Sequence, residues 1–183
     1  VVYMLGLFVN IRPLNRGDAP LPQDPDRLPT VDILVPSYNE EPELLRVTLM
    51  AATQVAYPAE KLAIHLLDDG GTVQKRSDAD PRKAAEALDR HETLKALCEE
   101  LGVNYLTRER NNSAKAGNIN AALAHTSGDL ILILDADHVP TQDILQRTVG
   151  HFLKDPDLFL VQTPHFFINP DPVEHNLGTF GSE

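Results

Sequence analysis

The chain has 183 residues, of which 42% are hydrophobic, a size and composition that suit one globular domain with a sizeable core. Its 16 Lys and Arg residues are outnumbered by 27 Asp and Glu residues, and the net charge of −11 argues against broad nucleic-acid binding, which requires basic surface. A phosphate ligand stays compatible with this charge, because a divalent cation can join an acidic site to an anionic substrate. The single cysteine, Cys98, excludes an internal disulfide and fits a reducing compartment, and its helical context favours a buried structural thiol.

The first 29 residues differ in character from the rest. VVYMLGLFVN (1–10) is apolar but too short to cross a bilayer, which takes roughly 20 residues, and it lacks the leading positive charge and cleavage site of a signal peptide. It fits a buried or interfacial segment, or the end of a transmembrane helix, and we expect the chain to be a fragment of a longer protein. RPLNRGDAPLPQDPDRLPT (12–30) is rich in proline and predicts an extended linker. We therefore expect residues 1–29 to form a membrane-proximal segment plus linker, and residues 30–183 to form one domain.

From Val31 onward, strand patterns alternate with helix patterns. Short apolar runs predict strands, and apolar residues three to four positions apart predict helices. The predicted strands lie within residues 31–36, 61–71, 103–109, 129–137 and 158–164, and the predicted helices within residues 41–57, 80–102, 113–128 and 141–155. The helix at 80–102 has the clearest ends, because Asp80 can cap it, Pro81 suits its first turn and Gly102 suits the position after its last.

This alternation predicts an α/β fold with a mainly parallel sheet and helices on both faces. The apolar strand LILIL (130–134) supports the prediction, since parallel strands are covered on both sides. In such sheets, ligands bind beyond the carboxyl ends of the strands. We expect one site at that edge, where the predicted strands are followed by Ser37, Tyr38, Asn39, Glu40, Asp68, Asp69, Gly70, Arg108, Glu109, Asp135, Asp137 and His138.

The segment LILILDADHVP (130–140) places two carboxylates one residue apart at the end of an apolar strand. Asp is rarely buried unpaired, so a cation, a basic side chain or solvent must compensate Asp135 and Asp137. Neither G-x-G-x-x-G nor a P-loop motif occurs, which weighs against a dinucleotide-binding oxidoreductase and a P-loop hydrolase. A phosphatase with an aspartyl nucleophile is disfavoured, because D-x-D follows the fourth strand and precedes His138. The pair instead suits one Mg²⁺ or Mn²⁺ ion that also binds a diphosphate.

Four motifs in order, VPSYNE, LLDDGG, KAGNINAAL and ILDADHVP, resemble the motif series of the family-two glycosyltransferases, which have the Rossmann-like GT-A fold. VQTPHFFINPDP (161–172) resembles the bacterial cellulose synthases within that family. The resemblance covers about residues 30–175. D-x-D alone is a weak signal, but four motifs in order with matching strand context are specific.

The resemblance implies a donor site built from Tyr38, Glu40, Asp68, Asp69, Lys115 and Asp135. Tyr38 would lie against the uracil ring, since an aromatic face suits a base, and Asp68 would accept the uracil N–H. Asp69 would support the loop or touch the ribose or donor sugar, and Lys115 would meet the diphosphate with help from a helix N-terminus. The plainer alternatives are a turn residue for Tyr38, a structural turn for DDGG and a solvated Lys115.

The resemblance also implies a metal site of Asp135, Asp137 and His138, although a lone His is more often a hydrogen-bonding or surface residue. Mg²⁺ or Mn²⁺ would be the cofactor. His165, Phe166 and Phe167 would lie near the glucan acceptor, where aromatic faces stack on sugars, and core packing is the alternative for at least one of the phenylalanines.

By the same resemblance, the intact protein would be a processive inverting enzyme that transfers glucose from UDP-glucose to the 4-hydroxyl of a growing β-1,4-glucan. The family's TED motif, with the base Asp, and its QxxRW motif do not occur here, so we expect the fragment alone to be inactive. The intact protein would lie at the cytoplasmic face of the bacterial inner membrane, with a periplasmic cellulose synthase subunit and a cyclic-di-GMP-binding PilZ domain. A chitin, hyaluronan or mannan synthase remains an alternative, as does a non-catalytic nucleotide-binding module, against which the intact D-x-D argues.

Overall fold

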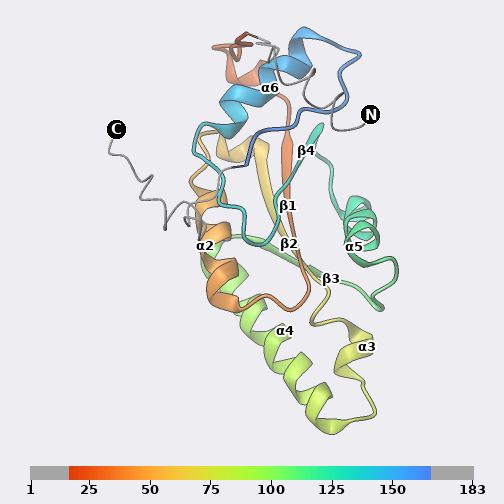
Figure 1. Cartoon of the computed structure of the whole chain (residues 1–183). Helices are drawn as coiled ribbons and strands as arrows, with labels where there is room; N and C mark the ends of the chain where they lie inside the picture. Colours follow the sequence, from red (N-terminus) through yellow and green to blue (C-terminus); the bar gives the residue numbers. More distant parts are fainter. Residues whose placement is uncertain (1–16, 166–183) are drawn as a thin grey trace, which may run out of the picture.

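The computed structural model describes residues 17–165, and in these residues four strands form one parallel sheet. The strands are β1 (Val31–Ser37), β2 (Leu62–Asp68), β3 (Asn104–Thr107) and β4 (Leu130–Ile133), in the order β3-β2-β1-β4 (Figure 1). Ser37 pairs with Asp68, and Asp68 pairs with Thr107, so these strands end level with one another. The predicted parallel sheet is confirmed, and its carboxyl ends share one edge.

Helices cover both faces of the sheet, as expected. The α-helices are α2 (Pro42–Thr53), α3 (Val73–Arg76), α4 (Pro81–Leu101), α5 (Ala114–Ala122) and α6 (Ile144–Lys154), and the 3₁₀ helices are η1 (Pro25–Arg27), η2 (Ala59–Lys61) and η3 (Leu123–His125). Side chains of α2, α4 and α6 pack into the larger core on one face, whereas Ala122 and Ile119 of α5 pack on the opposite face (Figure 1).

Strand β1 shows how the alternation of side chains serves both cores. Val31, Ile33 and Val35 point into the larger core with α2 and α4, and Leu34 points into the smaller core under α5. Every residue of β1 is buried. Each such aliphatic side chain contributes about 1.5–3 kcal/mol by leaving water, so β1 is firmly held between the two layers.

Helix α4 begins and ends where its sequence signals predict. The carboxylate of Asp80 accepts a hydrogen bond from the backbone N–H of Arg82, and Pro81 is the first helical residue. Gly102 follows the last turn with a left-handed φ of 68°, a conformation that costs glycine little. The helix buries Ala87, Leu94, Leu97 and Cys98.

Two expectations for the C-terminal half are wrong. Ile131 and Ile133 of β4 are 43% and 47% exposed, so β4 is covered on one side only. The predicted strand at 158–164 is absent, because this segment forms no ladder with any strand in the described part of the chain. Phe159 and Leu160 are 89% and 63% exposed there. Apolar composition suggested a strand, but a strand also requires a neighbour that takes up its backbone hydrogen bonds.

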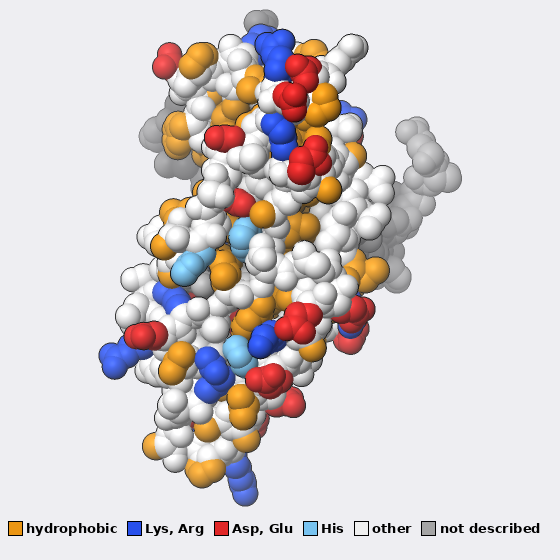
Figure 2. All heavy atoms as spheres, turned by 180° about the vertical axis from the view of Figure 1, so that it is seen from behind, with side chains coloured by type: hydrophobic (Ala, Val, Ile, Leu, Met, Phe, Trp, Pro, Cys, Tyr) orange, Lys and Arg blue, Asp and Glu red, His pale blue; other side chains and the backbone are white. Residues whose placement is uncertain are grey.

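Residues 17–29 lie against the domain. Ala19 and Leu28 are buried, Leu21 packs on the larger core, and the Tyr57 hydroxyl donates to the carbonyl oxygen of Pro29 over 2.6 Å. The described part of the proline-rich segment therefore packs on the domain and contains the 3₁₀ helix η1, and the domain boundary near residue 30 stays a prediction. The apolar segment 1–10 lies outside the described residues. Within residues 17–165, no helix has the length and apolar character needed to span a bilayer, and acidic and basic side chains are intermixed on the face shown in Figure 2.

Candidate functional site

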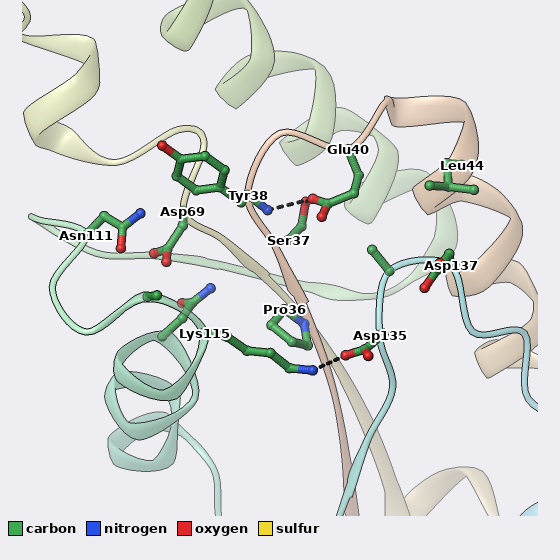
Figure 3. Close-up of a pocket in the computed structure, with 13 residues that line it drawn as sticks. Pro36, Ser37, Tyr38, Glu40, Leu44, Asp69, Asn111, Lys115, Asp135 and Asp137 are labelled. Atoms are coloured by element: carbon green, nitrogen blue, oxygen red, sulfur yellow. Dashed lines mark hydrogen bonds and ion pairs between the residues drawn. The ribbon is translucent and has the colours of Figure 1, made fainter. Parts of the chain in front are cut away.

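A cavity of about 640 Å³ lies at the carboxyl edge of the sheet (Figure 3). Its walls come from the segments that follow β1, β2 and β4 and from the start of α5. The lining residues are Pro36, Ser37, Tyr38, Glu40, Leu44, Asp69, Asn111, Ala114, Lys115, Asn118, Asp135, Ala136 and Asp137. The expected convergence of polar strand ends is thus confirmed.

The turn after β1 is closed by Glu40. One carboxylate oxygen of Glu40 accepts hydrogen bonds from the Ser37 hydroxyl (2.8 Å) and from the backbone N–H groups of Tyr38 (2.6 Å) and Asn39 (3.1 Å). Burial alone would raise the pKa of Glu40, but these hydrogen bonds outweigh it and hold the pKa below its ordinary value. Glu40 is therefore ionised and shapes the turn. Tyr38 is 46% exposed, and the ammonium of Lys75 lies 3.8 Å from its ring centroid.

Asp68, at the end of β2, lies behind the cavity and does not line it. Its Oδ1 accepts from the Gly70 N–H (2.9 Å) and Arg90 Nε (3.0 Å), and its Oδ2 accepts from the Gly71 N–H (2.8 Å) and the Tyr105 hydroxyl (2.8 Å). Burial, with the nearby Asp68 carboxylate, raises the pKa of Tyr105, so its hydroxyl remains a donor. A carboxylate has about four acceptor positions, and all four are used here. The uracil contact expected for Asp68 stays a prediction, and it would require one of these bonds to open.

Asp69, the next residue, lines the cavity and pairs with a different arginine. Arg108 Nε and Nη2 donate to its two carboxylate oxygens, each over 2.7 Å. The same guanidinium also donates to Asn111 Oδ1 and to the carbonyl oxygens of Asn112 and Ala114. Arg108 thus joins the DDGG loop to the loop before α5. This two-point pairing fixes the orientation of the Asp69 carboxylate.

Close packing around Asp68 explains why both positions after DD in the DDGG loop are glycines. A Cβ at position 70 would lie 2.2 Å from Arg90 Nε and 2.3 Å from the carbonyl oxygen of Tyr38. A Cβ at position 71 would lie 2.5 Å from Asp68 Oδ2. Neither position has room for a side chain, so the local reason for both glycines is the approach of neighbouring groups.

Helix α5 brings Lys115 to the other end of the cavity. Lys115 Nζ donates to Asp135 Oδ1, and this hydrogen bond is the main reason that the pKa of Asp135 lies below its ordinary value (Figure 3). Ser113, just before the helix, and Ala114, its first residue, adopt positive φ angles of 60° and 45°, which are uncommon for residues other than glycine. Asn118 donates to the Leu67 carbonyl oxygen over 2.8 Å and so joins α5 to the end of β2.

The D-x-D segment extends beyond β4 with both carboxylates accessible. The side chains of Asp135 and Asp137 are 44% and 71% exposed, and the carbonyl oxygen of Ala136 between them accepts from the buried Thr48 hydroxyl over 2.7 Å. The His138 ring nitrogens lie 3.9 Å from Asp135 Oδ2 and 3.8 Å from Asp137 Oδ1. His138 also packs edge-on against His165, with ring centroids 4.3 Å apart. Phe166 and Phe167 lie outside the described residues.

The donor set at this segment fits a hard divalent cation. Asp135 and Asp137 both line the cavity and offer carboxylate oxygens, the ligands that Mg²⁺ and Mn²⁺ prefer. Among residues 17–165, no three Asp, Glu, His or Cys side chains are already grouped as a complete metal site. Two protein carboxylates are enough where a substrate diphosphate supplies further ligands. That His138 supplies a third ligand to the cation stays a prediction.

The structure thus unites most of the residues chosen from the sequence and adds others. Six of the chosen residues line the cavity: Tyr38, Glu40, Asp69, Lys115, Asp135 and Asp137. His138 and His165 lie beside D-x-D, whereas Asp68 lies behind the wall. Sequence reasoning missed Arg90 and the pairing of Arg108. Arg108 had a signal, its place at the end of β3, but nothing local distinguishes Arg90 from other arginines of a polar helix.

The parallel sheet with its edge cavity fits a GT-A-like fold, and the chain belongs to a family of glycosyltransferases. The profile of Glycosyl transferase family 2 matches residues 32–181. Over 181 residues, the chain is 46% identical to the cellulose synthase catalytic subunit (UDP-forming) of Xanthomonas axonopodis pv. citri (strain 306), covering 99% of this chain and 22% of that protein. It is 44% identical to cellulose synthase 1 of Komagataeibacter xylinus over 177 residues, which are 97% of this chain and 10% of that protein.

A solved structure agrees with the fold. A mannosyltransferase from Pyrobaculum calidifontis, in complex with GDP-Man and Mn²⁺, superposes with a TM-score of 0.53 at 28% sequence identity. The match covers 84% of this chain and 40% of the mannosyltransferase. The chain spans about a fifth or less of the length of the two cellulose synthases named above. The family profile shows its family, and the mannosyltransferase structure agrees with its fold.

Proposed function

We propose that this chain is the donor-binding part of a processive, inverting cellulose synthase that transfers glucose from UDP-glucose to the 4-hydroxyl of a growing β-1,4-glucan. The observation that carries the proposal is the layout of the cavity. An exposed aromatic ring, Tyr38, lies at one end, and Lys115 with the Asp135 and Asp137 carboxylates lies at the other (Figure 3). The identity to UDP-forming cellulose synthases supports UDP-glucose as the donor.

The two ends suit the two halves of a nucleoside diphosphate. A nucleobase can stack on the Tyr38 ring, whose position is fixed by the turn that Glu40 closes. The diphosphate would lie toward Lys115, at the positive N-terminus of α5. Asp69, held by Arg108, also lines the cavity and would accept a hydrogen bond from the nucleoside or the donor sugar.

A Mg²⁺ or Mn²⁺ ion held by Asp135 and Asp137, with His138 as the expected third ligand, would offset the charge that develops on the departing diphosphate. Lys115 neutralises Asp135 in this structure. With Asp135 bound to a cation, the Lys115 ammonium would be available to bind a phosphate oxygen. The same lysine would therefore exchange its partner when donor and cation bind together.

For the intact protein, we propose that it is embedded in a membrane, extends a glucan acceptor, and works with a periplasmic subunit and a PilZ domain. Its active site would lie at the cytoplasmic face of the bacterial inner membrane. The relatives are cellulose synthases, which supports these expectations. His165 contacts His138 beside D-x-D, and this contact supports the proposal that His165 lies near the acceptor sugar.

Calorimetric titration with UDP tests the proposal. Binding should strengthen on addition of Mg²⁺ or Mn²⁺, and Asp135→Asn and Asp137→Asn should each abolish that gain. Asp89→Asn, an exposed carboxylate on α4, is the matched control and should keep it. An equal metal effect in the wild type and both D-x-D variants would refute the metal assignment.

A second titration tests the donor base. GDP and CDP should bind more weakly than UDP if the site serves UDP-glucose. The similar mannosyltransferase was solved with GDP-Man, so GDP is the informative competitor. Preference for GDP over UDP would move the proposal to a different sugar donor while leaving the family membership unchanged.

A further inference from the structure

Arg90 binds two strand-end loops at once without reaching the cavity. It lies on α4, and its guanidinium donates to Asp68 Oδ1 from Nε (3.0 Å), to the Glu40 carbonyl oxygen from Nη1 (2.7 Å) and to the Ser37 hydroxyl from Nη2 (2.8 Å). Its side chain is only 14% exposed, and that of Asp68 is fully buried. Each of the three guanidinium nitrogens therefore has its own partner in a protected environment.

These three partners belong to the two loops that shape the base end of the cavity. Ser37 and Glu40 bound the turn that carries Tyr38, and Asp68 begins the DDGG loop. Gly70 lies between them, so close to Arg90 and to the Tyr38 carbonyl oxygen that it has no room for a Cβ. Backbone pairing also joins the two loops, since Ser37 pairs with Asp68 and the Asp69 N–H donates to the Ser37 carbonyl oxygen over 2.8 Å. Arg90 adds the side-chain link between the Tyr38 turn and the DDGG loop.

We propose that Arg90 is a positioning residue for donor binding, which holds the Tyr38 platform at the correct distance from the DDGG loop. The inference rests on the proposed function, because it assumes that a nucleoside stacks on Tyr38. Only a planar guanidinium can serve three acceptors in one plane, whereas a lysine ammonium offers a single point. The packing of α4 depends on other residues, since Ala87, Leu94, Leu97 and Cys98 fill the core.

The chain contains a matched control for Arg90. Arg46 on α2 pairs with a carboxylate as well, donating to both carboxylate oxygens of Glu100 on α4 over 2.7 and 3.0 Å. Arg46 is not among the residues that line the cavity or bind its loops. Arg46→Gln therefore removes an arginine–carboxylate pair, one more exposed than that of Arg90, without touching the site.

The test compares the chain with Arg90→Gln, Arg90→Lys and Arg46→Gln, using uridine and UDP as probes and urea unfolding for stability. Arg90→Gln should weaken uridine and UDP by the same factor of about tenfold, which is about 1.4 kcal/mol. The strengthening of UDP binding by Mg²⁺ should be unchanged, since Lys115, Asp135 and Asp137 make no contact with Arg90. Arg46→Gln should leave both affinities unchanged.

Arg90→Lys separates positioning from folding. It keeps a positive charge beside the buried Asp68, so it should be more stable than Arg90→Gln, yet it should bind uridine as weakly. The inference would be overturned if Arg90→Lys had both the uridine affinity and the stability of the wild type. It would also be overturned if Arg90→Gln bound uridine like the wild type, or if Arg46→Gln lost as much affinity as Arg90→Gln. If the wild-type chain binds neither uridine nor UDP, the proposed function itself fails, which is a distinct result.

Discussion

Replacing Gly70 with alanine tests how closely the two loops must approach. The new Cβ would lie 2.2 Å from Arg90 Nε and 2.3 Å from the Tyr38 carbonyl oxygen. Since non-bonded carbon contacts normally lie near 3.5 Å, the Tyr38 carbonyl must move by about 1 Å. Overpacking of this kind costs about 1–3 kcal/mol, so we expect Gly70→Ala to lower the free energy of unfolding by that amount. Because Tyr38 moves with its carbonyl, UDP affinity should also fall by about tenfold, as a 1.4 kcal/mol loss implies.

Gly102→Ala provides the control, because its cost has a different origin. Gly102 has a φ of +68°, and nothing lies within 4 Å of a Cβ built there. Alanine in this left-handed conformation costs about 1–2 kcal/mol, a destabilisation similar to that of Gly70→Ala. Urea unfolding and calorimetry would be run on both variants. The reasoning is refuted if Gly70→Ala binds UDP like the wild type, or if Gly102→Ala weakens UDP equally.

Two further predictions follow from the pKa shifts. Burial, with a smaller effect of the Asp68 carboxylate, raises the pKa of the Cys98 thiol to about 12. Iodoacetamide, which reacts with the thiolate, should therefore label the native chain about 10³ times more slowly than the urea-unfolded chain. Equal labelling rates would contradict the burial of Cys98. Lys115 lowers the pKa of Asp135 below 3.8, so this pair stabilises the fold above that pH, and the stabilisation is lost as the pH falls through the lowered value. Lys115→Gln should therefore be less stable than the wild type at neutral pH and should approach it in strong acid, whereas a difference independent of pH would count against the ion pair.

The elements of the fold could be predicted because their signals are local. Helix α4 has its cap, its first proline and its final glycine within the helix or next to it, and all three act as predicted. The parallel sheet followed from strand–helix alternation. The strand expected at 158–164 failed for the opposite reason, since pairing depends on a neighbouring strand and not on composition.

The site could be predicted as a set of residues but not as a geometry. Parallel strands bring their carboxyl ends to one edge, so Tyr38, Asp69, Lys115 and Asp135 could be assigned to one place from their positions after strands or at a helix start. The sequence could not predict which of the two adjacent aspartates, Asp68 or Asp69, faces the cavity. Asp68 turns inward to four donors and Asp69 faces the cavity, because the path of the backbone after β2 decides the direction of each side chain.

By itself, the sequence determined the four strands of the sheet and the four longer helices in their order along the chain, the edge at which the site forms, and the carboxylates available for a cation. The tertiary structure alone decided how these groups are held. Arg90 binds partners that lie 22, 50 and 53 residues away in the sequence, and Arg108 binds Asp69 across 39 residues. The sequence alone does not distinguish Arg90 and Arg108 from the other arginines as partners of these carboxylates. Packing chose between them, because only a folded chain brings a guanidinium and a buried carboxylate within hydrogen-bonding distance and excludes the water that would otherwise solvate both.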